Sequence, residues 1–437
     1  MITATIGKIF LEAYNEKFGT NYDAKTFFVE EYYPLFFDSN KYLQWVQNSP
    51  FVQMKKGQKV ETLTSDERRE KLQDFIRKVD SCKVPDASIA PGFPASEEKG
   101  FATTSGQVTN LNFSTTKEDI YYSWLGSSLG IGVRGGYILF SDKTILLDLF
   151  DGWVLYRKAL NEIDKLKGNQ INSWNGQWLA HCYDKKNYHP TEPMAEFNPY
   201  DTQNEGMSIK TISWTNLLIK IAKHFNNAKL ISYIYGFDAK KKLPVTFGFI
   251  LTNLEGIRRP LDLYRKFFGM NDNEGNKAED LWGSEDGLRV SCQKGIIGVE
   301  AMKPKGLKQF MEGKTPKPAL NEEQQINYNV YQIWLLAMLN NQELWDKSQE
   351  FAKKLHHYAC SGTNGRTGNS RKVDEIKSSI NKKQFIEAVA AIMPDIDNVD
   401  DVVKLVELVN VMPTDNVPYF LTLLRFHYAA MENNSKK

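Results

Sequence analysis

Three segments decide the fold: SGQVTNLNFS (105–114), GSSLGIGVRGGYILF (126–140) and GNQINSWNGQWLAH (168–181). The stretch from 106 to 179 that they define is the richest in Gly, Asn, Gln and Trp. Residues 117–129 look helical or irregular. Residues 137–140 and 144–150 are apolar, β-prone runs on either side of the polar residues 141–143, a pattern that predicts a β-hairpin. A helix is expected around residues 153–166, ended by Gly168.

The segment Gly130-Ile131-Gly132-Val133-Arg134-Gly135 has the letters of a dinucleotide-binding fingerprint. That motif requires a strand before the glycines and a helix opening at the third one. The expected hairpin leaves no such helix, so nucleotide binding is disfavoured. We expect these glycines to allow two backbones to approach closely or to adopt a positive φ before the hairpin.

Polar, nearly uncharged side chains lie on both sides of these glycines. Asn and Gln amides offer a donor and an acceptor together, which suits adenine in the major groove. The candidate base-reading residues are Gln107, Asn110, Asn112 and Asn172. Ordinary turn and helix-cap chemistry is the alternative, because Asn and Ser readily bond to local backbone.

Outward from this stretch, helices and strands mix. The N-terminal 80 residues show helical spacing of aromatic residues. Residues 81–105 and 181–210 are expected to be loops, because they are rich in Pro, Gly and polar residues. Residues 230–235 and 245–250 predict two strands joined by a basic turn that contains Lys240, Lys241 and Lys242.

From residue 320 onward the pattern is wholly helical. Residues 330–358 form one long helix or two, and residues 333–339 are apolar on all sides, as in a central bundle helix. A Lys- and Pro-rich segment, 302–318, precedes them. We therefore expect an α+β protein, with a mixed α/β N-terminal domain over 1–318 and an all-α helical bundle over 319–437.

The formal net charge is only +2, so the chain as a whole does not attract nucleic acid. Between Lys347 and Lys383, however, there are nine basic residues and three acidic ones, a local excess of six positive charges. A later acidic run, Asp395, Asp397, Asp400 and Asp401, offsets it. The basic segment could track a phosphate backbone, or it could simply be a solvated helix surface. The candidate phosphate contacts are Lys353, Lys354, Arg366, Arg371 and Lys372.

No catalytic, metal or cofactor site is expected. The four cysteines lie far apart and form no Cys-x-x-Cys pair, which favours a reducing compartment. His181, Cys182 and His189 lack the regular spacing of metal ligands. The sequence shows no nucleophile elbow, no signal-peptide pattern and no apolar run of membrane-spanning length, so the expected location is the cytoplasm.

The chain resembles the large subunit of type I CRISPR effector complexes (Cascade), most like the type I-B branch. The resemblance rests on residues 48–51 in the aromatic helical start, 129–133 before the hairpin, 168–175, and the all-α region after a basic linker. Some relatives carry two Cys-x-x-Cys pairs in a zinc-binding insert. This sequence has none, so no metal is implied.

The resemblance implies a non-catalytic subunit that reads the motif beside a double-stranded DNA target, promotes strand separation and holds the displaced strand. Its partners would be a guide-RNA-containing multi-subunit complex and a helicase-nuclease, and base pairing by the guide would read the remaining sequence. The C-terminal bundle resembles the small subunit of such complexes. The competing hypothesis is a structural or interaction protein with a helical oligomerisation bundle and no nucleic-acid role.

Overall fold

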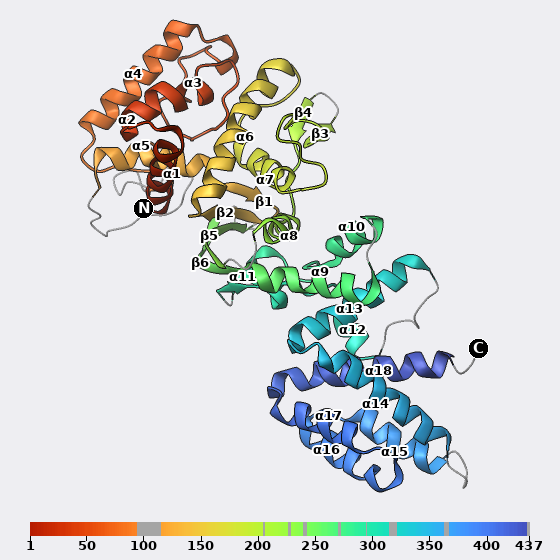
Figure 1. Ribbon diagram of the computed structural model, residues 1–437. Coiled ribbons are helices and arrows are strands. Elements are labelled where there is room, and N and C mark those ends of the chain that lie inside the picture. The colour runs from red at the N-terminus through yellow and green to blue at the C-terminus, as the bar shows by residue number, and fades with distance from the viewer. Residues whose placement is uncertain are drawn as a thin grey trace. The chain divides into compact units, whose positions relative to one another are not determined.

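The structure is a computed structural model that describes residues 1–93, 115–203, 206–225, 229–238, 243–269, 272–293, 295–313, 321–361 and 367–434. It confirms the α+β class: helices predominate, and they accompany a five-stranded mixed sheet (Figure 1). The chain divides into two compact units. The first unit comprises Met1–Glu255 with Gly287–Gly298, and the second comprises Gly256–Asp286 with Val299–Lys437.

The first unit begins with helices that share an aromatic core. They are α1 (Ile2–Phe18), α2 (Ala24–Phe27), a π-helical turn (Phe28–Tyr32), α3 (Tyr33–Phe36), α4 (Ser65–Ser81) and α5 (Lys117–Ser128). Gly19 ends α1 in the left-handed region with φ 66°. Thr64 and Thr116 open α4 and α5 with capping boxes.

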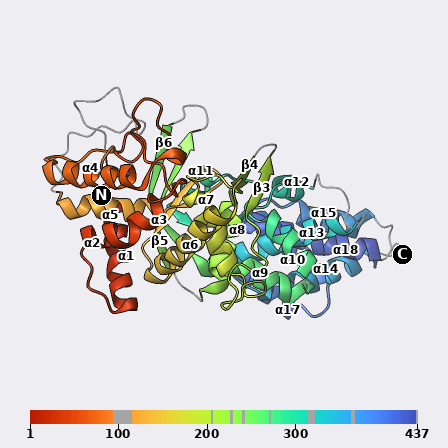
Figure 2. The same ribbon diagram turned by 90° about the horizontal axis from the view of Figure 1, so that it is seen from above.

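Helices α1 and α5 pack closely, and Figure 2 shows α1, α4 and α5 grouped together. Glycine is present at the crossing on both helices, at Gly7 and Gly126. A Cβ added at Gly126 would lie 1.8 Å from the carbonyl oxygen of Thr3, and one added at Gly7 would lie 2.0 Å from that of Tyr122. The two backbones therefore touch without intervening side chains.

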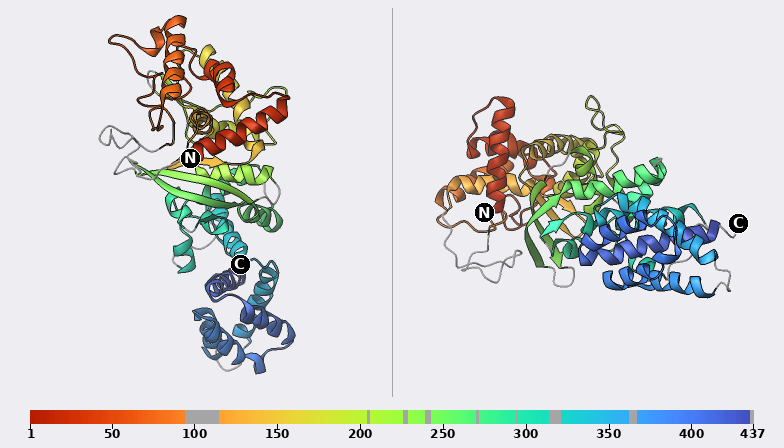
Figure 3. Two further views of the ribbon diagram at one scale, coloured as in Figure 1. Left: turned by 90° about the vertical axis from the view of Figure 1, so that its left-hand side faces the viewer. Right: turned by 60° about the horizontal axis from the view of Figure 1, so that its bottom comes forward.

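The main sheet has the order β1-β2-β5-β6-β7. Its strands are β1 (Ile131–Val133), β2 (Gly136–Phe140), β5 (Lys229–Asp238), β6 (Leu243–Asn253) and β7 (Ile296–Ile297). All pairs are antiparallel except β6 with β7. The predicted strands at 230–235 and 245–250 are confirmed in β5 and β6, which form a long hairpin (Figure 3).

The predicted hairpin over 137–150 is wrong in its second half. Residues 144–150 belong to α6 (Lys143–Glu162), which opens where the Asp142 side chain accepts a hydrogen bond from the backbone N–H of Ile145. Ile145, Leu146, Leu149 and Phe150 are buried at helical spacing. The actual hairpin lies one element earlier, between β1 and β2.

The remaining elements of the first unit are α7 (Ile171–Cys182), β3 (Tyr200–Gln203), β4 (Gly206–Ile209), α8 (Trp214–His224) and α11 (Leu288–Cys292). The expected loop over 181–210 therefore contains a small antiparallel pair, β3 with β4. The predicted helix around 153–166 is the C-terminal part of α6 and ends earlier, at Glu162.

The second unit is helical throughout its described residues. It contains α9 (Leu254–Phe268, from Gly256 on), α10 (Asp272–Leu281), α12 (Leu307–Met311), α13 (Glu322–Leu339), α14 (Glu343–Cys360), α15 (Thr367–Ser378), α16 (Lys382–Ala390), α17 (Asp400–Val411) and α18 (Val417–Asn434). Short 3₁₀ turns lie at Val299–Met302, Met393–Asp395 and Thr414–Asn416. Residues 330–358 thus form two helices, separated by Asn340 in the left-handed region.

The division into units differs from the expected boundary at residue 318, because residues before it pack on helices after it. Helix α10 packs on α13, where Lys277 pairs with Glu322 at 3.6 Å. The Trp334 indole N–H donates to the carbonyl of Val299 at 3.0 Å. Residues 256–286 and 299–313 therefore belong with the C-terminal helices.

Candidate nucleic-acid interface

The glycines of the central stretch serve backbone packing. A Cβ at Gly132 would lie 3.0 Å from the carbonyl carbon of Asn172, and one at Gly176 would lie 2.7 Å from the carbonyl oxygen of Gly132, so α7 and β1 touch backbone to backbone. Gly135 takes φ 96° in the turn between β1 and β2. Both roles that we expected of these glycines are present, and no helix opens at the third glycine.

Two asparagines of α7 use their amides inside the fold. The Asn172 side-chain NH₂ donates to the carbonyl of Gly130 at 2.7 Å. The fully buried Asn175 donates to the carbonyls of Ser128 at 2.7 Å and Gly130 at 2.9 Å. These bonds satisfy carbonyls between the end of α5 and the start of β1, where no regular ladder does so.

The tryptophans of α7 act in the same way. The Trp174 indole N–H donates to the carbonyl of Gly152 at 2.8 Å, and that of Trp178 donates to the carbonyl of Asp148 at 2.7 Å. Both acceptors lie on α6, so α7 is fastened to α6 as well as to β1. The asparagines and tryptophans of α7 therefore form the local hydrogen bonds that were the alternative to base reading. The side-chain N–H groups of Asn172 donate to carbonyls within the fold.

We expect Asn175→Ala to lower the free energy of unfolding by about 2 kcal/mol, because the buried carbonyl of Ser128 would lose its side-chain donor and that of Gly130 would keep only the one from Asn172. Gln177→Ala is the matched control: Gln177 also donates from α7 to a carbonyl, that of Lys210 at 2.9 Å, but at the surface. Its replacement should cost under about 0.5 kcal/mol. Urea unfolding of both variants checks this, and equal midpoints would contradict it.

The other base-reading candidates, Gln107, Asn110 and Asn112, lie outside the described residues, as does Arg366. Their proposed role stays a prediction. The four remaining basic candidates lie on two neighbouring helices: Lys353 and Lys354 on α14, Arg371 and Lys372 on α15.

Lys354 and Lys372 hold a loop in place. Lys372 Nζ lies 2.8 Å from an Asp395 carboxylate oxygen, which also accepts a hydrogen bond from the Tyr358 hydroxyl at 2.8 Å. Lys354 Nζ donates to the carbonyl of Asn398 at 2.6 Å. The Lys372 contact lowers the pKa of Asp395, and Asp395 raises the pKa of Lys372. These two lysines therefore fasten residues 395–398 to α14 and α15.

Lys353 and Arg371 remain at the surface. The Arg371 side chain is 83% exposed, and its nearest carboxylate is Glu375, one turn along the same helix at 3.6 Å. Such exposed pairs contribute little to stability and exchange readily for another anion. Lys353 is exposed on α14. Of the described candidates, these two are the most available to a phosphate backbone.

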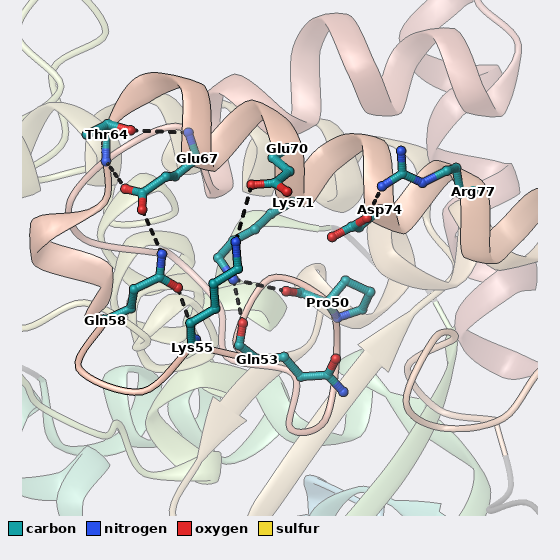
Figure 4. Close-up of polar contacts among 10 residues, drawn as sticks. All are labelled: Pro50, Gln53, Lys55, Gln58, Thr64, Glu67, Glu70, Lys71, Asp74 and Arg77. Atoms are coloured by element: carbon teal, nitrogen blue, oxygen red, sulfur yellow. Dashed lines mark hydrogen bonds and ion pairs between the residues drawn. The ribbon is translucent and has the colours of Figure 1, made fainter.

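A groove on the first unit lies between α4 and residues 50–58 (Figure 4). Lys71 Nζ donates to the carbonyls of Pro50 and Gln53 and so fixes the loop, and burial lowers the pKa of Lys71. Three lysines line the groove (Lys55, Lys71 and Lys78), and so do three carboxylates, those of Glu67, Glu70 and Asp74. This balance of charge does not favour a polyanion.

Among the described residues, no three His, Cys, Asp or Glu side chains gather in a way that could hold a metal ion. His181 instead places its Nε2 3.1 Å from the carbonyl of Pro193. Burial raises the pKa of the Cys182 thiol to about 12, so this thiol is a poor ligand and nucleophile near neutral pH.

The sheet places four aromatic side chains on one face that sequence analysis did not single out: Tyr137 on β2, Tyr233 and Tyr235 on β5, and Phe249 on β6. We call this the aromatic face. The alternation of Ile231, Tyr233 and Tyr235 is a signal that could have revealed part of it. The cross-strand neighbours depend on register, which the sequence leaves open.

Comparison with protein-family models, curated proteins and solved structures found no match to this chain. Within the described ranges, every helix is too short or too polar to cross a membrane.

Proposed function

We propose that this chain is a non-catalytic, nucleic-acid-binding subunit of an RNA-guided effector complex of the type I CRISPR kind. In this role it recognises the motif beside a DNA target, promotes strand separation and helps recruit a helicase-nuclease. The sequence resemblance suggests the complex. The observation that carries nucleic-acid binding is the excess of positive charge in the sequence between Lys347 and Lys383. Its described basic residues lie on the helices α14, α15 and α16.

Physical chemistry supports a phosphate-binding role for this surface. Arg371 and Lys383, with side chains each 83% exposed, pair with carboxylates on their own helices, at 3.6 and 3.7 Å. A polyanion can displace such partners, and the release of counterions from the nucleic acid favours binding at low salt. A small net charge for the whole chain is compatible with this, because one basic surface is sufficient for local contact.

Replacing Lys353 and Arg371 together by alanine should weaken duplex DNA binding uniformly across sequences. Loss of two phosphate contacts lowers the slope of log affinity against log salt by about 1.8. Fluorescence anisotropy with the full chain between about 50 and 200 mM salt measures this slope.

Lys158→Ala is the matched control for that pair. Lys158 is an exposed base on α6 with an i,i+4 carboxylate, Glu162, at 3.9 Å, which is the same arrangement as Arg371 with Glu375. The control should leave the slope unchanged. An unaltered slope in the double variant, or an equal change in Lys158→Ala, would count against this surface.

Membership of an RNA-guided complex is tested by mild-salt purification of the tagged protein from its native cell. We expect short RNAs of uniform length together with a multi-copy protein partner. Recovery of the chain alone and free of RNA, with the neighbouring subunits expressed, would exclude the proposal. If the complex is recovered, duplexes with varied flanking motifs then test Gln107, Asn110 and Asn112.

A second candidate function, an interaction protein, draws on exposed apolar residues of the bundle. Ile380 is 72% exposed and Val411 is 80% exposed. Both lie where Lys382 Nζ donates to the carbonyls of Asn410 and Met412, so they share one corner of the bundle. Exposed apolar clusters favour protein contact. If this candidate holds, Val411→Asp should reduce the assembly mass measured by light scattering.

A further inference from the structure

The two faces of the β5–β6 hairpin have opposite environments. On one face Ile234, Ile250 and Ser232 are at most 1% exposed. On the other face Ile231 is 58% exposed, Phe249 is 64% exposed and Ile296 of β7 is 54% exposed. Tyr233, Tyr235 and Tyr137 are half-buried beside them. Large apolar side chains gathered on a solvent-facing sheet surface mark a site of interaction.

The rings of the aromatic face form a continuous row across three strands. Tyr137 lies opposite Tyr235, with ring centroids 5.4 Å apart. Tyr235 and Tyr233 are 6.2 Å apart along β5. Tyr233 lies opposite Phe249, with centroids 5.2 Å apart and the rings edge to face. Each ring therefore supports its neighbour, and Phe249 is the most exposed.

A β-bulge shapes this surface. The register between β5 and β6 shifts between Ile234 and Tyr235, where Gly248 takes φ 76°. A bulge of this kind increases local twist and re-aims side chains. It lies beside Phe249, at the exposed end of the row of rings.

Two described basic residues, Lys229 and Arg134, belong to the strands and turns that carry the row. Lys229, which is exposed, lies on the same face of β5 as Tyr233, because residues two apart in a strand point the same way. Arg134 is exposed in the turn between β1 and β2. The described side chains that alternate onto this face from β2, β5, β6 and β7 include no carboxylate. The surface thus combines exposed rings with positive charge, which complements an anionic polymer that has aromatic faces of its own.

We infer that the aromatic face binds a single nucleic-acid strand by stacking its unpaired bases on Phe249 and Tyr233, with Lys229 and Arg134 near its phosphates. The inference rests on the proposed nucleic-acid role and adds that the nucleic acid bound at this face is single-stranded. In a duplex the flat faces of the bases are covered by neighbouring bases, so only an unpaired strand can offer them to a ring. Sheet-borne aromatic residues stack bases in this way in RNA-binding folds.

Anisotropy with a fluorescein-labelled oligothymidine of about 16 nucleotides tests the inference on the full chain. Phe249→Ala should weaken binding of the single strand about tenfold, since a base stack on one ring contributes roughly this factor. Phe249→Trp should retain binding. Phe249→Leu, which keeps apolar contact but removes the ring, should bind as weakly as the alanine variant. Duplex affinity should be unchanged in all three variants.

Trp45→Ala is the matched control, because Trp45 is an aromatic residue of the first unit that is 47% exposed and belongs to none of the strands. It should leave binding of the single strand unchanged. Ultraviolet cross-linking of a bromouracil-containing strand should label peptides within Lys229–Asp238 or Leu243–Asn253.

The inference is overturned if the native chain does not bind the strand, if Phe249→Ala binds like the native chain, or if Phe249→Leu retains full affinity. The last outcome would assign the face to an apolar protein partner. These results are separate from the purification test of the proposed complex. If RNA-containing complexes are recovered but Phe249→Ala binds the single strand as well as the native chain, only the aromatic-face inference is rejected. If Phe249→Ala weakens binding of the single strand but no complex is recovered, only the proposed complex is rejected.

Discussion

Gly126→Val is expected to prevent the first unit from folding. The Cβ of any residue at this position would lie 1.8 Å from the carbonyl oxygen of Thr3, which is well inside contact distance. That oxygen belongs to the backbone of α1, so it cannot rotate away as a side chain would. Gly7 on α1 faces the backbone of α5 in the same way, at 2.0 Å from the carbonyl oxygen of Tyr122. The two helices would have to separate and expose their shared core.

Gly126→Ala is the milder substitution at this position, and its effect on the free energy of unfolding can be measured. We expect a loss of about 3 kcal/mol or more in the free energy of unfolding, because overpacking here displaces backbone. Gly368→Ala is the control: Gly368 also lies within a helix, α15, but an added Cβ there meets nothing within 4 Å. It should be neutral or stabilise by up to about 1 kcal/mol.

Urea unfolding followed by tryptophan fluorescence distinguishes the two glycine variants, because Trp124 lies in the core of the first unit, two residues from Gly126. A midpoint for Gly126→Ala equal to that of the native chain would refute the close crossing of α1 and α5.

Acidification is expected to destabilise the second unit through His427. This residue is 3% exposed on α18, its ring lies 4.8 Å from that of Trp345, and burial lowers its pKa to about 4. In the unfolded chain the pKa returns to about 6.5. The unfolded state therefore binds a proton more readily, and stability falls as the pH drops from about 6.5 to 4.

The size of this loss follows from the pKa difference. Between pH 7 and pH 4 it should amount to about 3 kcal/mol from this one residue. His427→Gln should remove that part of the pH dependence, because glutamine does not titrate. His357→Gln, at an exposed position on α14, is the control and should keep the native pH dependence. Urea midpoints measured at pH 7 and pH 4 make the comparison; identical pH dependence in all three proteins would disprove the role of His427.

Sequence patterns predicted the elements whose signals are local. The apolar residues of 333–339 predicted a central helix, and six of the seven are buried in α13. The β-branched and aromatic runs at 230–235 and 245–250 predicted β5 and β6. In both cases the residues of one segment carry the whole signal, either through composition or through periodicity.

Residues 144–150 show where a local signal is ambiguous. A short apolar run fits a strand or a buried helix equally well by composition. In the structure this segment is part of α6: Asp142 is the N-cap and accepts a hydrogen bond from the Ile145 N–H, and the buried residues recur at helical spacing. The N-cap lies just outside the apolar run, so a pattern confined to that run does not reveal it.

By itself, the sequence determined the α+β class, the all-helical C-terminal region and the locations of glycines that permit close backbone contact. Only the tertiary structure decided which residues far apart in the chain contact one another. It gave the amides of Asn172 and Asn175 to carbonyls between α5 and β1, grouped residues 256–286 with the C-terminal helices, and aligned Tyr137 with Tyr235. The physical reason is range: composition and periodicity arise within one segment, whereas hydrogen-bond partners and strand register depend on residues far apart in the chain.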